Sequence, residues 1–252
     1  MSGKVGIVTG ASRGMGCHFV AALLEQGARV AAFARPSAEL ETLAAKHGNA
    51  ALAVPCDVSD SAQVNEAIAK AADHFGTIDF LVNNAAIFHP FKLEEASNAQ
   101  VMDHIATNLA GPIWCIRAAI PHLRKAKGHI VSISSESVRM PYPFLSLYAA
   151  TKGGLETLMA AMREELREDG IRVTTLRSGA VEGGTGGRDW DPDVTQRFFE
   201  TITRTGHAAF SGQPASPESM AEALIRILSM PPDINVDMVE VRAANVGTPA
   251  RQ

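Results

Sequence analysis

The feature that most constrains the fold is a regular alternation of short, apolar, β-rich runs with longer helical patterns along the whole chain. The β-rich runs predict strands at about 4–9, 29–34, 51–55, 78–82, 128–134, 171–176 and 236–242. The helical patterns fall between them, at 14–27, 38–47, 60–75, 98–124, 147–169 and 217–229. Because crossovers between parallel strands are right-handed, this alternation predicts an α/β chain with a doubly wound parallel sheet of about seven strands and helices on both faces.

Local signals support this division and indicate one continuous domain. Asp60, Ser97 and Ser216 have side chains that cap helix N-termini, and each precedes a helical pattern. At 252 residues, with 46% apolar and 20% charged residues, the chain can bury a sizeable core. We therefore expect a single domain over 1–252, in which the long irregular segment 179–215 forms a substrate lid.

Composition and charge exclude several function classes. The 27 acidic and 23 basic residues leave a net charge of −4 without a basic block, so we expect no nucleic-acid partner. The longest apolar run, 19–24, is too short to span a membrane, and no signal-peptide pattern is present, which favours a cytoplasmic protein. Cys17, Cys56 and Cys115 are too few and too scattered for zinc or a disulfide framework, and the histidines show no close pairing, so we expect no metal.

A glycine-rich turn follows the first predicted strand and precedes the first helix. From Thr9 to Gly16 the spacing is Gly-x-x-x-Gly-x-Gly, unlike the standard Gly-x-Gly-x-x-Gly. Glycines in such a turn let the backbone approach a pyrophosphate, and the helix N-terminus presents free N–H groups. The turn therefore predicts dinucleotide binding and a Rossmann-type sheet, with a ligand-free tight turn as the alternative. Its candidate binding residues are Gly10, Ser12, Arg13, Gly14, Met15 and Gly16.

Polar residues recur at the carboxyl ends of the next strands, where a doubly wound sheet binds its ligand. Arg35 ends the second strand, near where NAD-binding sheets carry an acid. Together with Arg13 it offers fork-shaped donors suited to a 2′-phosphate, which predicts NADP(H). A solvated arginine is the alternative reading. After the third strand, the candidates are Asp57, whose carboxylate could accept a hydrogen bond from adenine, and Val58. After the fourth strand they are Asn84 and Ala85, although an asparagine at a strand end is also an ordinary turn residue.

A candidate catalytic group surrounds the start of the helix at 147–169. Tyr148 and Lys152 are four residues apart and so share one helix face. A phenol has a pKa of about 10, and a neighbouring cation favours its ionised form. Ser135, at the end of the fifth strand, could donate to a substrate carbonyl oxygen. Asn108 could hold a water for proton relay, although a functionless helix asparagine is the alternative.

Together these features resemble the short-chain dehydrogenase/reductase family over nearly the whole chain. The motifs that carry the resemblance, in the family's order and roughly its intervals, are Thr9-Gly10-x-x-x-Gly14-x-Gly16, Asp57, Asn83-Asn84-Ala85, Asn108, Ser135 and Tyr148-x-x-x-Lys152. The resemblance implies that Tyr148 is the general acid/base and that Lys152 lowers its pKa and binds the nicotinamide ribose. It further implies that Ser135 polarises the carbonyl and that Asn108 completes the proton relay.

Three positions depart from the family pattern. The fourth strand is followed by Ala86 where the family has glycine, which adds a methyl group near the cofactor. Ser178 stands where members usually carry the proline of a Pro-Gly pair, so the loop that meets the nicotinamide, with Gly179 and Val181, could be set differently. Ser134 neighbours Ser135, which leaves open which of the two hydroxyls acts.

The function that these residues predict is an NADP(H)-dependent carbonyl reductase, reversible as a secondary-alcohol dehydrogenase. The Arg35 ending and Arg13 resemble the NADP-preferring branch of the family. A non-catalytic NADP(H)-binding regulatory protein is one alternative, because fold does not dictate function. An NAD-linked alcohol dehydrogenase or an epimerase-like member is another.

Aromatic residues recur where the substrate pocket is expected, which predicts a bulky, largely apolar carbonyl substrate. They are Phe88, Tyr142, Phe144, Trp190, Phe198, Phe199 and Phe210. Glycines at 179, 183, 184, 186 and 187 would let the lid close. The alternative is that Phe198 and Phe199 only anchor the lid to the body.

The helical patterns 99–123 and 148–168 resemble those that the family uses to build four-helix dimer interfaces. Their candidate interface positions are Ile105, Leu109, Leu158 and Met162. We expect a homotetramer, with a dimer as the alternative. Packing of these residues on the sheet of their own chain would explain the same pattern.

Overall fold

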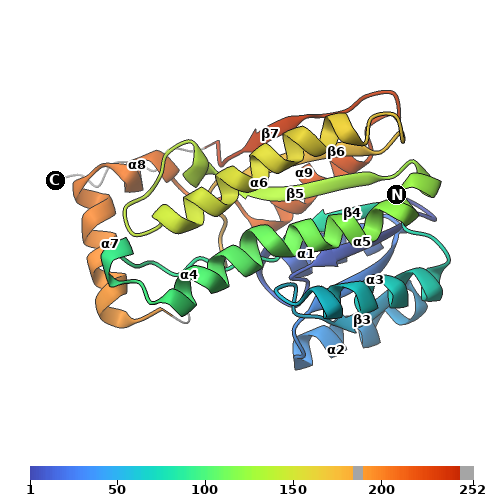
Figure 1. Ribbon diagram of the computed structural model, residues 1–252, viewed down its shortest axis with the longest axis horizontal. Helices are drawn as coiled ribbons and strands as arrows, with labels where there is room; N and C mark the ends of the chain where they lie inside the picture. Colours follow the sequence, from blue (N-terminus) through green and yellow to red (C-terminus); the bar gives the residue numbers. More distant parts are fainter. Residues whose placement is uncertain (184–189, 245–252) are drawn as a thin grey trace.

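A single parallel sheet forms the centre of the protein in the computed structural model, which describes residues 1–183 and 190–244 (Figure 1). The strand order across the described sheet is β3-β2-β1-β4-β5-β6-β7, and all pairs are parallel. The strands are β1 Val5–Thr9, β2 Arg29–Ala34, β3 Ala51–Pro55, β4 Phe80–Asn83, β5 His129–Ser135, β6 Arg172–Ser178 and β7 Met238–Val241. This confirms the predicted doubly wound, Rossmann-type fold.

Each predicted helical pattern contains a helix of the structure, with ends that differ by a few residues, and two further helices, α7 and α8, were not predicted. The helices are α1 Gly14–Glu25, α2 Ala38–His47, α3 Ser61–Phe75, α4 Asn98–Ile105, α5 Gly111–Ala126, α6 Ser146–Glu165, α7 Pro192–Arg204, α8 His207–Ser211 and α9 Pro217–Leu228. Asp60 and Ser216 cap α3 and α9 as predicted, and Ser97 begins α4 with a full capping box. In the described residues, no helix is both long and apolar enough to cross a membrane.

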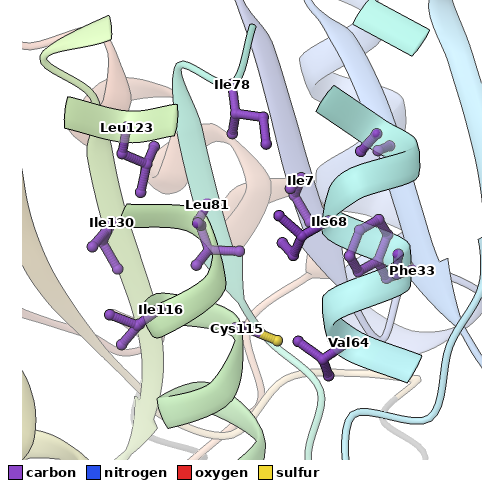
Figure 2. Close-up of a cluster of buried hydrophobic side chains, with 14 of the residues drawn as sticks. Ile7, Phe33, Val64, Ile68, Ile78, Leu81, Cys115, Ile116, Leu123 and Ile130 are labelled. Atoms are coloured by element: carbon purple, nitrogen blue, oxygen red, sulfur yellow. The ribbon is translucent and has the colours of Figure 1, made fainter. Parts of the chain in front are cut away.

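Two apolar layers enclose the sheet because successive strand residues point to opposite faces. Ile7 of β1 faces α3 and α5, where it packs in one cluster with Ile68 and Ile116 (Figure 2). Its neighbour Val8 faces the other side and packs with Leu224 of α9. These layers fix the sheet between α3, α5 and α6 on one face and α1, α2 and α9 on the other.

Two segments differ from the sequence-based expectation. The predicted helix 98–124 is divided: a π-helical segment, Ala106–Ala110, joins α4 to α5. The segment 179–215 is less irregular than expected, because α7 and α8 form within it and Val181 pairs with Ala215 at its two ends. An Asp191 cap and Pro192 at the first turn explain why α7 begins there.

The direction of strand order reverses beside β1, between the half that runs to β3 and the half that runs to β7. A crevice forms at the carboxyl ends of the strands at such a switch point, because the connections leave in opposite directions. Helices α7 and α8 lie at the left end of Figure 1. The fold therefore places the glycine turn, the end of β5 and described residues of the segment 179–215 around one space.

Candidate active site

One cavity of about 1270 Å³ collects nearly all the predicted site residues. Of that set, the residues lining it are Gly10, Ser12, Arg13, Gly14, Met15, Arg35, Asp57, Val58, Asn84, Ala85, Ser135, Tyr148, Lys152, Gly179 and Val181. Gly16 and Asn108 do not line it. Its volume is large enough for a dinucleotide together with a substrate.

The glycine turn at the end of β1 is shaped so that side chains are excluded. Gly10 and Gly14 have φ angles of 65° and 56°, in the left-handed region that favours glycine. A Cβ on Gly16 would lie 2.1 Å from the Gly10 carbonyl oxygen, so this glycine sets the packing of the turn and does not face the cavity. Within residues 1–183 and 190–244, no side chain caps the first turn of α1, so the backbone N–H groups of this helix can bind an anion.

Asn84 and Ala85 hold this turn against β4. The Asn84 side chain donates to the Thr9 carbonyl at 2.9 Å, and the backbone N–H groups of Asn84 and Ala85 both donate to the Thr9 hydroxyl at 3.0 Å. A Cβ on Gly10 would lie 2.8 Å from the Ala85 Cα. The Asn84 side chain therefore holds the backbone of the glycine turn in place. Ala86, two residues further on, lines the cavity.

The far end of the cavity contains two arginines and a carboxylate in the expected places. Arg13 and Arg35 both line it, at the start of α1 and just after β2. Asp57 accepts hydrogen bonds from the backbone N–H and the hydroxyl of Ser59, which fix its orientation. Glu39 also lines this end, and the Arg13 charge helps to hold the pKa of its carboxyl below the ordinary value, after larger effects of hydrogen bonds from its own backbone and from Ser37.

The catalytic candidates lie where α6 begins beside the end of β5. The Tyr148 phenol and the Ser135 hydroxyl line the same cavity, close enough for Ser135 to favour the ionised phenol. The Lys152 ammonium donates to the Ile133 carbonyl at 2.7 Å and lies 5.9 Å from the centre of the Tyr148 ring. Ser134 also lines the cavity, but its hydroxyl donates to Glu156 at 2.6 Å. This geometry favours Ser135 as the hydroxyl that faces the reacting group.

Burial dominates the electrostatics of this group. It raises the pKa of Tyr148 above the ordinary value; the hydrogen bond with Ser135 opposes the rise, and the charge of Glu136 adds to it. Burial also lowers the pKa of Lys152 to about 8. The expected lowering of the Tyr148 pKa by Lys152 stays a prediction.

Asn108 lies in the π-helical segment, fully buried and behind the wall of the cavity. Its amide oxygen accepts from the backbone N–H of Ile87 at 2.8 Å, and its nitrogen donates to the Ile87 carbonyl at 2.8 Å and to Thr151 at 3.3 Å. The side chain thus joins the segment after β4 to α6. Its relay role stays a prediction.

The loop after β6 reaches the same cavity through Gly179 and Val181. Ser178, in the position of the family's proline, donates its hydroxyl to the Gly179 carbonyl at 2.9 Å and contacts the Met15 sulfur at 3.8 Å. A Cβ on Gly179 would lie 2.9 Å from Cγ of Arg242, so the glycine is needed for close packing.

Aromatic side chains form the wall opposite Tyr148. Phe88 lies 5.6 Å from the Tyr148 ring and 5.5 Å from Trp190, and Trp190 lies 5.5 Å from Phe198. The Trp190 indole also donates to the Phe88 carbonyl at 3.1 Å. Tyr142 and Phe199 complete the predicted residues in this wall.

Two predicted aromatic residues do not line this cavity. Phe144 packs against Phe198 and faces a separate surface pocket, and Phe210 stacks against Arg242. Phe198 is buried and also lines the cavity, so it both anchors α7 and faces the ligand space. Of the predicted hinge glycines, Gly179 and Gly183 line the cavity, whereas positions 184, 186 and 187 lie outside the described residues.

Sequence reasoning did not assign several polar lining residues. Glu136, Ser137 and Ser211 all face the same cavity. The only sequence signal was the unusual run of hydroxyls and a carboxylate after β5, and nothing marked Ser211. The described residues contain no group of three or more His, Cys, Asp or Glu that could hold a metal ion.

Comparison with known proteins identifies the family. A model of the short chain dehydrogenase family matches residues 4–191. An oxidoreductase of Staphylococcus haemolyticus is 30% identical over 96% of this chain and 98% of its own, and farnesol dehydrogenase of Aedes aegypti is 31% identical over 96% of both. The structure of 3-ketoacyl-(acyl-carrier-protein) reductase from Brucella melitensis, complexed with NADH, superposes with a TM-score of 0.82 at 30% identity, over 95% of this chain and 97% of that one. The protein therefore belongs to the short-chain dehydrogenase/reductase family, whose members are oxidoreductases that use NAD(P)(H).

Proposed function

We propose that the protein is an NADP(H)-dependent reductase of bulky, largely apolar ketones or aldehydes, reversible as a secondary-alcohol dehydrogenase. The observation that carries the proposal is that Ser135, Tyr148 and Lys152 share one cavity with the glycine turn and with Arg35. A regulatory protein without catalysis would not need a phenol, a hydroxyl and a buried ammonium arranged at the substrate end.

The residues present fit a dinucleotide. The pyrophosphate would lie at the uncapped N-terminus of α1, where Gly10 and Gly14 allow close approach of the backbone. Arg13 and Arg35 would hold the 2′-phosphate with charge-assisted hydrogen bonds, and Asp57 would accept from the adenine amino group. When bound, the nicotinamide supplies the hydride that reduces the carbonyl carbon.

The protein's own groups handle the proton and the developing charge. Tyr148 gives its phenolic proton to the carbonyl oxygen during reduction and takes it back during oxidation. Ser135 donates a hydrogen bond to the same oxygen, where negative charge develops. Lys152 provides a positive charge beside the phenol, which favours the ionised phenolate left after proton transfer, and would bind the nicotinamide ribose.

The aromatic wall supports an apolar substrate. Phe88, Trp190 and Phe198 offer stacked and edge-on surfaces, and each buried CH₂ group of a ligand contributes about 0.8 kcal/mol. The Aedes aegypti relative is named for farnesol, a long apolar alcohol. Substrates of this class would leave water outside the space around Tyr148.

The test is turnover of a panel of ketones and alcohols with NADPH, NADH and their oxidised forms, followed by absorbance of the reduced nicotinamide. We expect turnover with NADPH that rises with the apolar size of the ketone. Tyr148→Phe should abolish turnover while NADPH affinity stays nearly intact. Lys152→Ala should reduce both turnover and NADPH affinity. No turnover across the panel, or ordinary turnover by Tyr148→Phe, would contradict the proposed function.

A further inference from the structure

A short turn after β5 holds the hydroxyl of Ser135. It is a single 3₁₀ turn over Glu136–Val138, and the backbone N–H of Ser137 within it donates to the Ser135 Oγ at 3.2 Å. A serine hydroxyl accepts through its lone pairs and donates its one proton. The bond from Ser137 uses an acceptor position, so the Ser135 proton stays available to an acceptor in the cavity. The position of the turn therefore sets where this proton is presented.

The Glu136 side chain ties this turn to segments that are far away in the sequence. Its Oε1 accepts from the hydroxyl of Ser211, the last residue of α8, at 2.6 Å and from that of Tyr142 at 3.4 Å. Its Oε2 forms an ion pair with Nε of Arg242, the residue after β7, at 3.1 Å. Glu136 is 5% exposed, and the protein itself engages both carboxylate oxygens. The carboxylate is therefore a joint between separate segments of the chain.

The partners of the carboxylate are themselves held in place. The Arg242 guanidinium lies 4.2 Å from the centre of the Phe210 ring and donates to the Phe210 carbonyl. The guanidinium of Arg139, the residue after the turn, lies 5.8 Å from the centre of the same ring and pairs with Glu240 of β7 at 3.2 Å. Helix α8 and the end of β7 are thus joined to each other as well as to Glu136.

Stability alone does not account for a buried ion pair at this place. Burying two charges costs much of what their attraction returns, and well-packed apolar side chains often stabilise a protein equally well. A carboxylate that accepts from several donors has a defined position, because charge-assisted hydrogen bonds are directional. Since Glu136 follows Ser135 directly in the chain, that position is passed to the turn and to the N–H of Ser137.

We propose that Glu136 is a positioning residue for Ser135. Ser211 and Arg242 fix the Glu136 carboxylate, and the turn that Glu136 begins directs the Ser135 proton toward the substrate oxygen. This inference rests on the proposed carbonyl reductase activity, in which Ser135 donates to that oxygen. In this role Glu136 acts through Ser135 and forms no bond with the substrate.

The test measures NADPH-dependent reduction of the ketone that the wild type converts best, by Glu136→Leu and Glu136→Gln. Leucine removes every polar contact of the carboxylate, and we expect kcat to fall about tenfold because a hydrogen bond in the transition state loses its geometry. KM for the ketone and the Kd of NADPH should change by less than about twofold, as for a contact made only in the transition state. Glutamine keeps neutral hydrogen bonds to Ser211 and Arg242, so it should restore part of kcat.

A Ser135→Ala background separates positioning from a direct effect of Glu136 on the reaction. If Glu136 acts through Ser135, adding Glu136→Leu should lower the single-turnover rate of Ser135→Ala no further. Glu222→Leu, the same change in an exposed ion pair with Arg226, should leave kcat of the wild type unchanged. An equal loss in both backgrounds, an unchanged kcat of Glu136→Leu or a rise in KM alone would overturn the proposed role.

Ser211→Ala keeps the test decisive if Glu136→Leu fails to fold. It removes only the 2.6 Å bond to the carboxylate, so we expect kcat to fall about threefold, and the loss to be absent in Ser135→Ala. Full kcat in Ser211→Ala would then contradict the positioning role. If the wild type reduces carbonyl compounds and these variants keep its kcat, the positioning role alone is rejected. Turnover of no carbonyl compound by the wild type would reject the proposed function.

Discussion

The charge on Lys152 is set by its burial beside Tyr148. Burial lowers its pKa to about 8, because an ammonium loses hydration inside the protein. Below that pH the ammonium is present, and above it the group becomes neutral. We therefore expect kcat/KM for ketone reduction to fall as the pH rises through about 8. A pH profile of the wild type and of Lys152→Arg tests this, since an arginine stays charged and should move the fall to higher pH.

The same pKa has a consequence for stability with a definite sign. An unfolded lysine keeps its proton up to about pH 10.4, so between pH 8 and that value the unfolded state binds more protons than the folded state. The contribution of Lys152 to the free energy of unfolding therefore rises with pH over this range. A profile of kcat/KM that stays level up to pH 10 would contradict the lowered pKa.

Arg35 is the residue from which the cofactor preference is inferred. It is exposed and lines the far end of the cavity with Arg13. Arg35→Asp should weaken NADPH binding by about 2 kcal/mol, because a charge-assisted fork is replaced by a repelling carboxylate. Titration of NADPH fluorescence measures this. Arg167→Asp, at an exposed arginine on the loop after α6, is the matched control. Equal or tighter binding of NADH by the wild type would contradict the preference.

At the scale of elements, α6 is joined to β5 and β6 through Glu156, which follows Lys152 by one helical turn. Glu156 receives two hydrogen bonds from Arg177 of β6, at 2.9 and 2.6 Å, and one from Ser134 of β5. Both charged side chains are mostly buried, at 10% and 16% exposed. These bonds join α6 to both β5 and β6.

Breaking this junction should cost stability. Glu156→Gln replaces one of the two carboxylates that Arg177 contacts, leaving the Glu240 pair at 3.1 Å, so we expect the free energy of unfolding to fall by about 2 kcal/mol. Glu222→Gln, in an exposed pair, should cost about 0.5 kcal/mol or less. Urea denaturation of both variants measures the difference. Equal losses would show that the junction adds no more than a surface pair.

At the scale of the whole molecule, one helical face has apolar side chains that its own chain covers only in part. Met102 is 59% exposed and Ile113 is 37% exposed, on α4 and α5. Ile105 and Leu109 lie between them in the chain and are half-buried. Leu109 packs on the core of its own chain, as do Leu158 and Met162. Packing on the sheet of the same chain therefore explains the apolar residues Leu109, Leu158 and Met162. Met102 and Ile113 stay exposed, and a second copy of the chain could bury them.

We expect a homotetramer in which this face is one interface. Ile113→Lys should shift the assembly to a smaller species, because an ammonium would be buried between copies. Leu93→Lys is the control, since Leu93 is 63% exposed on another segment. Light scattering at micromolar concentration measures the mass. A stable wild-type monomer would contradict the expectation.

The sequence by itself predicted the fold class that the structure shows and most of the residues that line the cavity. The alternation of strands and helices is physically local, because each element's periodicity follows from which of its faces is buried. The glycine turn, Ser135, Tyr148 and Lys152 were likewise found by spacing within short segments.

Only the tertiary structure decided which side chains meet across long separations. It brought Ser211 and Arg242 to Glu136, and it turned Ser134 to Glu156 and so left Ser135 for Tyr148. Such pairs depend on how separate elements pack, which no local pattern records.

The segment 179–215 and the interior of the sheet show the same limit of sequence-based prediction. Glycine and threonine made 179–215 resemble an irregular loop, yet apolar packing of Phe198 and Ile202 stabilises a helix there. In β1, Gly6 is an unremarkable strand residue in the sequence. In the folded chain a Cβ at that position would lie 1.8 Å from the Phe80 ring, so the packing of a neighbouring strand requires the glycine.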